Sequence, residues 1–221
     1  MISSRLTDGI APMYTLYYAP GSAAMLVHLT LLECSAPHRL CKVDLEAGQQ
    51  RSAEYLALNP DGVVPTLVID GQAHGESAAL AMLLAERHPE AALAPAPGSA
   101  TRASYLQWMF YLANSLQPAF RQWFYAGEYV PDGVEVIKEA ARIRIESAWS
   151  RLDTHLATHG PHMLGSEFSV LDLYATMLMR WSRNMPRPAT GWSHLATLAS
   201  SIKTRQSWRR LYEIEGLTEW A

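Results

Sequence analysis

A turn near the start of the chain has the residue types of an anion-binding site. Residues 17–22 read YYAPGS, so two tyrosines end an expected strand and Ser22 stands where the next helix begins. Backbone N–H groups and the helix dipole favour negative charge there. Lowering a ligand thiol's pKa by two units from about 8.5 takes about 2.7 kcal/mol. One hydroxyl hydrogen bond and a helix N-terminus are of that size. The alternative is that Ser22 only caps the helix.

Two further segments have the composition of a peptide-binding site. If the Val64-Pro65 bond is cis, the Val64 amide and carbonyl turn outward and can pair with an extended peptide. An ordinary trans proline at a strand start is the alternative. Glu76-Ser77 precede an expected helix, so Ser77 can receive a ligand carboxylate and Glu76 a ligand ammonium group. A capped helix with a surface glutamate explains the same pair.

These segments must be positioned by alternating strands and helices in the first ninety residues. The order β-α-β-α-β-β-α suits a mixed sheet with helices on both faces. A Pro-rich stretch then indicates a linker. We expect strands at residues 13–18, 38–44, 63–69 and 72–75, and helices at 23–34, 52–58 and 78–88.

The rest of the sequence is helical and holds the largest side chains. All 7 tryptophans and all 4 phenylalanines follow residue 100, which indicates two domains with different packing. Long helices are expected at 102–126, apolar on more than one face, and at 134–159. A third begins at Ser169 with a capping box to Asp172, and shorter ones follow at 195–207 and 208–215. The predicted boundaries are 1–12 for a disordered lead-in, 13–89 for the α/β domain, 90–100 for the linker and 101–221 for the helical domain.

Composition argues against several classes of protein. The charges sum to 18 − 21 = −3, and a nucleic-acid partner needs clustered cations. The uncharged run 9–32 is interrupted by Pro20-Gly21, so we expect a strand and a helix there, not a membrane span. Residues 1–12 lack the apolar core of a secretory signal. Cys34 and Cys41 have no metal-ligand spacing, so no metal and a cytoplasmic location are expected.

In this order, and followed by an aromatic helical half, the three segments resemble the glutathione transferase family. The resemblance runs from residue 13 to the C-terminus. It rests on the Y-x-x-P-G-S turn, N-P-x-G-x-V-P at 59–65, Glu76-Ser77, and F-S-V-L-D at 168–172, which is similar to the family's capping box and hydrophobic staple. It implies a thioredoxin-like N-terminal domain that binds glutathione, an all-α C-terminal domain, and a homodimer.

The resemblance also implies which residues contact glutathione. Val64 and Pro65 match the cis-proline segment that pairs with the cysteinyl part. Glu76-Ser77 match the pair that holds the γ-glutamyl end. Gln49 or Gln50 falls where the family often places a polar contact to the glycyl carboxylate.

For the catalytic position the resemblance offers alternatives. The bacterial beta class, which the opening motif most resembles, carries a cysteine where this chain has Ala23, and this departure argues against a mixed disulfide on the enzyme. Ser22 lies in the register of the serine-rich turn of zeta-like members and is the expected thiolate stabiliser. Tyr18 and Tyr17 are alternatives, because some classes use a strand-end tyrosine. Gln117 aligns where the beta class carries a histidine, a second departure.

The implied activity is the detoxifying conjugation of glutathione, as co-substrate, to small hydrophobic electrophiles. The same site could isomerise a cis-double-bonded keto acid, or reduce a peroxide or disulfide, although Ala23 disfavours reduction. A non-catalytic binding or regulatory protein is a further alternative, which the intact glutathione segments oppose. For the acceptor pocket the sequence proposes Phe110, Tyr111, Asn114 and Gln117.

Overall fold

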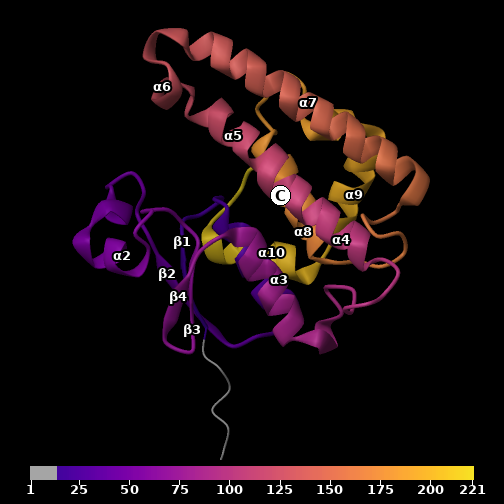
Figure 1. Ribbon diagram of the computed structural model, residues 1–221, viewed down its shortest axis with the longest axis horizontal. Coiled ribbons are helices and arrows are strands. Elements are labelled where there is room, and N and C mark those ends of the chain that lie inside the picture. The colour runs from indigo at the N-terminus through magenta and orange to yellow at the C-terminus, as the bar shows by residue number, and fades with distance from the viewer. Residues whose placement is uncertain (1–13) are drawn as a thin grey trace, which may run out of the picture.

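The protein is described by a computed structural model that covers residues 14–221 (Figure 1). A four-stranded sheet with its helices forms the N-terminal part, and an all-helical region follows, as the sequence predicted. The lead-in expected at 1–12 lies outside the described residues. The exact domain boundaries stay a prediction.

The sheet has the mixed topology of a thioredoxin-like domain. Its strands are β1 (Tyr14–Tyr18), β2 (His38–Lys42), β3 (Thr66–Ile69) and β4 (Gln72–His74). They lie in the order β2-β1-β3-β4, with β1 and β2 parallel and the other pairs antiparallel. The expected strand at 63–69 begins only at Thr66, because Pro65 has no N–H for the sheet. The three residues before it therefore form a loop.

Three helices flank the sheet: α1 (Ala24–Glu33), α2 (Ala53–Leu58) and α3 (Ser77–Arg87). The whole of α1 from Ala24 to Leu31 is buried, since α3 and the C-terminal helices α8 and α10 all pack against it. This burial accounts for the uncharged run in the sequence. No described helix is long and apolar enough to cross a membrane.

The C-terminal region is built from seven α-helices among the described residues, with the long α7 on the side away from the sheet (Figure 1). The helices are α4 (Arg102–Tyr111), α5 (Gln117–Phe124), α6 (Ala126–Tyr129), α7 (Val134–His159), α8 (Val170–Trp181), α9 (Ser193–Lys203) and α10 (Gln206–Glu215). In the described chain as a whole, short 3₁₀ turns lie at Gln49–Arg51, Pro89–Ala91, Pro131–Gly133 and Ala189–Gly191.

The prediction of a single helix at 102–126 is wrong, because the helix is divided in the middle and its second part, α5, already ends at Phe124. A π-helical segment, Leu112–Leu116, separates α4 from α5, and the Gln117 amide donates to the Leu112 carbonyl five residues back. Pro118 follows directly and has no amide to offer the α-helical ladder. The direction of the chain is kept, but its hydrogen bonding changes at the point where α5 begins.

The start of α8 confirms the capping box predicted from the sequence. The Ser169 hydroxyl accepts from the Leu171 amide, and the Asp172 carboxylate accepts from the Ser169 amide at 2.8 Å. The other Asp172 oxygen accepts from the Met163 amide at 2.8 Å. One buried carboxylate therefore fixes both the helix start and the loop before it.

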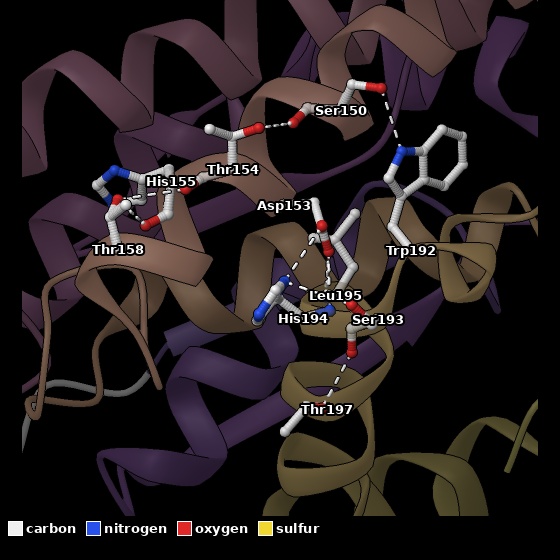
Figure 2. A network of polar contacts seen from close by, with 10 residues as sticks. All are labelled: Ser150, Asp153, Thr154, His155, Thr158, Trp192, Ser193, His194, Leu195 and Thr197. Carbon is white, nitrogen blue, oxygen red and sulfur yellow. Dashed lines mark hydrogen bonds and ion pairs between the residues drawn. The ribbon is translucent and has the colours of Figure 1, made fainter.

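A second carboxylate holds α9 on α7 (Figure 2). Asp153 of α7 accepts from the backbone amides of His194 and Leu195 at 2.8 and 3.1 Å, and lies 3.2 Å from His194 Nδ1. The Trp192 indole donates to the Ser150 hydroxyl beside it. These bonds satisfy first-turn amides of α9, which is why α9 begins at Ser193, earlier than the expected 195.

Asp153→Ala is expected to lower the free energy of unfolding by about 1 to 2 kcal/mol, the range for a lost helix cap. Burial alone would raise the pKa of Asp153, but the hydrogen bonds from His194 and Leu195 outweigh it and hold the pKa below its usual value. The carboxylate therefore stabilises the fold above the unfolded-state pKa of about 3.9, and this contribution is lost as pH falls through the lower folded-state value.

Urea denaturation of wild type, Asp153→Ala and Asp153→Asn at several pH values measures this contribution. The exposed neighbour variant Thr154→Ala serves as the control. We expect the gap between wild type and Asp153→Asn to be constant at neutral pH and to close in acid. A gap that widens as pH falls would contradict the assignment.

Candidate active site

A cavity of about 800 Å³ lies where the sheet domain meets the helical region. The residues around it come from the turn after β1, the segment after β2, the loop before β3, the start of α3, helices α5, α6 and α8, and the segments that follow α8 and α10. They are Pro20, Gly21, Ser22, Ala23, Leu45, Gln50, Arg51, Gly62, Val63, Val64, Pro65, Glu76, Ser77, Gln117, Arg121, Phe124, Tyr125, Glu128, Arg180, Trp181, Arg183 and Leu217.

The turn after β1 is held in place from the helical region. The Gly21 amide donates to Glu215 Oε2 at 2.9 Å, and the Gly21 carbonyl accepts from the Trp181 indole at 3.0 Å. Gly21 has φ +70°, a conformation that favours glycine. Glu215 also accepts from His28 Nδ1 at 2.8 Å, with both side chains fully buried. Residues from α8 and α10 thus fix the turn that carries Ser22.

Ser22 is half-buried at the wall of the cavity. Its hydroxyl donates to the Ala19 carbonyl at 2.7 Å and accepts from the Ala24 amide at 3.2 Å. The side chain therefore caps the first turn of α1, although the N-cap position itself is Ala23. To donate to a ligand sulfur, the hydroxyl must turn away from the Ala19 carbonyl. It can keep its bond from Ala24 while doing so.

The Val64-Pro65 bond is cis, which decides between the two alternatives left open by the sequence. Neither the amide nor the carbonyl of Val64 forms a hydrogen bond among the described residues. The loop is held by its neighbours: the Tyr55 hydroxyl and the Asn59 amide group donate to the Val63 carbonyl at 2.8 and 2.9 Å. The Val64 backbone is therefore a rigidly held donor and acceptor pair at the cavity.

Glu76 and Ser77 lie where the cavity meets the N-terminus of α3. Ser77 is buried and is the first residue of that helix, whereas Glu76 is exposed. Glu76 has φ +66°, a left-handed conformation that costs about 1 to 3 kcal/mol in a non-glycine residue and is concentrated at functional sites. This strained backbone presents the first-turn amides of α3 and the two side chains together.

Of the two glutamines, only Gln50 lines the cavity. Its Oε1 is buried and has no hydrogen-bond partner among the described residues, so this acceptor is unsatisfied. Gln49 instead accepts from the Asp44 amide at 2.9 Å in the exposed preceding loop. Of the two glutamines that the sequence left open, Gln50 is therefore the one at the cavity, and its contact with glutathione stays a prediction.

The structure places the two tyrosine alternatives outside the cavity. Tyr17 is half-buried, with its ring against Tyr55 at 5.9 Å between centroids. Tyr18 is buried beside His28, and its pKa is raised by burial and then by Glu215. Neither hydroxyl belongs to the cavity wall, because the chain turns toward the site only after β1 ends.

Three of the four expected acceptor-pocket residues also lie elsewhere. Phe110 is 58% exposed. Tyr111 and Asn114 line a separate outer groove of about 470 Å³ between α4, α5 and α7. Gln117 alone of the four reaches the main cavity. The helix α5 contributes to both hollows, with Arg121 and Phe124 on one face and Pro118 and Gln122 on the other.

Sequence reasoning missed most of the wall that comes from the helical region, where only Gln117 was expected. No sequence motif identifies these residues, because they come from several segments that are far apart in the sequence. The missed residues are Arg121, Phe124, Tyr125, Glu128, Arg180, Trp181, Arg183 and Leu217, together with Leu45 and Arg51 from the sheet domain.

In the described part of the chain, neither the two cysteines nor a cluster of possible metal ligands forms another site. Neither Cys34 nor Cys41 lines the cavity. Burial, with Glu90 and Glu33 nearby, raises the pKa of the Cys34 thiol to about 12. Among residues 14–221 no group of three or more His, Cys, Asp or Glu side chains could hold a metal ion.

Several known proteins are similar to this chain in sequence. Residues 16–92 match the family model for the glutathione S-transferase N-terminal domain. GstA, a glutathione S-transferase of Escherichia coli O157:H7, is 28% identical over 205 residues, which cover 91% of this chain and 98% of that protein. Glutathione S-transferase 2 of Anopheles gambiae is 30% identical over 172 residues (75% and 79%). A maleylacetoacetate isomerase of Dictyostelium discoideum is 30% identical over 171 residues (76% and 77%).

A solved structure extends the likeness to three dimensions. The glutathione S-transferase of a sphingomonad, in complex with glutathione, superposes with a TM-score of 0.82 at 28% identity, over 92% of this chain and 100% of that one. The fold, a thioredoxin-like domain followed by a helical domain, is thus that of an enzyme class with solved members. The chain belongs to the glutathione S-transferase family.

Proposed function

We propose that the protein joins the thiolate of glutathione to a small electrophile. The observation that carries the proposal is that one cavity holds Ser22, Val64-Pro65 and Glu76-Ser77. These are the segments that the resemblance to the family assigns to the catalytic hydroxyl, the cysteinyl part and the γ-glutamyl end. The similar sphingomonad enzyme was solved with glutathione, which supports the same co-substrate here.

Each part of glutathione then has a partner of suitable chemistry. The γ-glutamyl carboxylate meets the α3 N-terminus at Ser77, where free amides favour an anion, and Glu76 pairs with the ammonium group. The free amide and carbonyl of Val64 pair with the cysteinyl backbone as an added strand. Gln50 lies on the side left for the glycyl end. This places the sulfur toward the Ser22 turn.

The chemical step needs the sulfur as a thiolate. The Ser22 hydroxyl donates a hydrogen bond to it, and the N-terminus of α1 adds the favourable end of its dipole. The thiol proton leaves to solvent, and the sulfur lone pair forms a bond to the electrophilic carbon. In a substitution the leaving group departs with its bonding electrons, and in an addition water protonates the resulting carbanion.

The alternatives share the binding of glutathione and differ in the chemical step after it. Isomerisation would use the same thiolate, adding to a double bond and leaving again, and a relative named maleylacetoacetate isomerase supports keeping it as the second candidate. Disulfide exchange through the enzyme's own sulfur is disfavoured, because Ala23 lines the cavity and neither cysteine does.

Retention on immobilised glutathione followed by turnover of 1-chloro-2,4-dinitrobenzene tests the proposal. We expect both retention and release of chloride. Retention without turnover of this acceptor or of a cis-enone would favour the non-catalytic binding protein. Failure to bind glutathione would remove the basis of the proposal.

Ser77→Ala and Glu76→Ala are each expected to weaken glutathione binding by about 10- to 100-fold, because each removes a hydrogen bond to a charged group of the ligand. Isothermal titration calorimetry measures the change. Glu54→Ala, an exposed glutamate outside the cavity, is the control for lost negative charge. Unchanged affinity in both site variants would remove the γ-glutamyl assignment.

We further propose a cytoplasmic homodimer that uses the outer groove. Ile143 of α7 lines the groove and is 56% exposed, and Phe110 of α4 and Val136 of α7 are further exposed apolar side chains on the two helices that border it. Exposed apolar patches of this kind are typical of subunit contacts. Light scattering decides between the 24.6 kDa chain and its dimer.

A further inference from the structure

Arg180 is a buried, positively charged side chain that has no role in the reaction proposed above. It is the penultimate residue of α8 and only 5% exposed, yet it belongs to the cavity wall. Its Nε donates to the Tyr212 hydroxyl at 2.9 Å. The two terminal nitrogens of the guanidinium form no hydrogen bond with any described residue.

The other arginines on the helical side of the cavity are neutralised. Arg121 pairs with Glu128, and Arg183 pairs with Glu219 at 2.8 Å. Arg180 has no carboxylate within ion-pair distance in the described part of the chain. The terminal nitrogens of Arg180 are not fully enclosed by the protein and belong to the cavity wall, so an anion bound in the cavity can pair with this charge.

The position of this guanidinium is defined by the turn that carries Ser22. A Cβ atom on Gly21 would lie only 2.9 Å from Arg180 Nη1 and 3.5 Å from Nη2. The absence of a side chain at Gly21 therefore lets the guanidinium lie against the turn. The neighbouring Trp181 fixes this end of α8, since its indole donates to the Gly21 carbonyl.

We propose that the electrophile carries a carboxylate, which Arg180 binds through its two free nitrogens. This inference rests on the proposed transferase function and names the substrate class of the same site. A planar guanidinium with two adjacent free N–H groups matches a carboxylate in a bidentate pair. The carboxylates of glutathione itself have other partners, at Ser77 and near Gln50 in the sheet domain. The apolar body of the acceptor lies against Phe124, Tyr125 and Trp181.

A matched pair of acceptors isolates the carboxylate. In 4-chloro-3-nitrobenzoate and its methyl ester, the sulfur forms a bond to the same ring carbon and chloride leaves with the bonding electrons. We compare kcat/KM for each acceptor, divided by its uncatalysed rate with glutathione. Wild type is expected to favour the acid. Arg180→Gln is expected to lower the value for the acid by about 10- to 100-fold more than for the ester.

The control Arg209→Gln removes the same charge from an exposed site and is expected to keep the preference for the acid. Arg180→Lys, which keeps the charge but loses the fork, is expected to retain part of it. An equal loss for acid and ester in Arg180→Gln would overturn the inference, because Arg180 would then act on the thiolate or the fold. So would a wild type without any preference for the acid.

A binding measurement on the wild-type protein tests the inference without depending on whether a variant folds. By calorimetry, S-(4-carboxybenzyl)glutathione is expected to bind about 10-fold or more tightly than its methyl ester. Equal binding of the two conjugates would overturn the inference while leaving the proposed function intact. If neither conjugate nor glutathione binds, the proposed function fails, and the inference with it.

Discussion

Glu215→Ala is expected to lower the free energy of unfolding by about 3 to 5 kcal/mol, the range for breaking a buried polar pair by removing one partner. The Glu215 carboxylate accepts from His28 Nδ1 and from the Gly21 amide, at 2.8 and 2.9 Å. Its loss leaves both donors buried without a partner. It also removes one of the contacts between α10 and α1, and the hydrogen bond from the turn that carries Ser22 to α10.

Urea denaturation at neutral pH measures this effect. Glu213→Ala is the matched control, since Glu213 lies in the same helix with its side chain 67% exposed, and should change stability little. Glu215→Gln is expected to fall between the two, because a carboxamide accepts one of the two hydrogen bonds and opposes the other donor with its NH₂ group. Similar small effects for Glu213 and Glu215 would show that the buried contact contributes nothing.

Ser22→Ala is expected to raise the apparent pKa of the bound glutathione thiol by about one unit or more, and to lower kcat/KM at neutral pH by about 10-fold or more. The reason is that the hydroxyl stabilises only the thiolate. Since the rate follows the thiolate fraction, a raised pKa moves the acid limb of the pH–rate profile to higher pH. Glutathione affinity should change little.

The pH–rate profile and the thiolate absorbance measure this shift, with Ser22→Thr as the variant that keeps a hydroxyl. Because Ser22 also accepts from the Ala24 amide, the alanine variant loses about 1 kcal/mol of capping, and a denaturation curve separates this loss from catalysis. An unchanged profile with reduced stability would leave Ser22 as a cap alone.

The features predicted well from sequence are those written within a few residues. Ser169 and Asp172 are three residues apart, so the capping box can be recognised locally. The strands and helices of the first half follow from short apolar runs between turn residues, and the helix Val134–His159 has the expected bounds. The break at Leu112–Leu116 was missed, although Pro118 gave a signal for it.

The contacts that complete the site could not be predicted in this way. Gly21 and Glu215 are 194 residues apart, and no spacing rule joins them. Arg180 sits in an apolar helix with nothing nearby in sequence to mark it as part of a cavity. Gln49 and Gln50 are chemically identical neighbours, and only the backbone of the turn decides which one lines the cavity.

The two faces of the short helix α5 line two different hollows, the cavity and the outer groove. It has 8 residues, about 12 Å of rise at 1.5 Å per residue. Phe124 borders the cavity and Gln122 borders the outer groove, only two positions apart. Because both faces belong to one short helix, a displacement of α5 at the groove also displaces Phe124 at the cavity. In the proposed dimer, a substitution at the groove is therefore expected to change the proposed acceptor pocket as well.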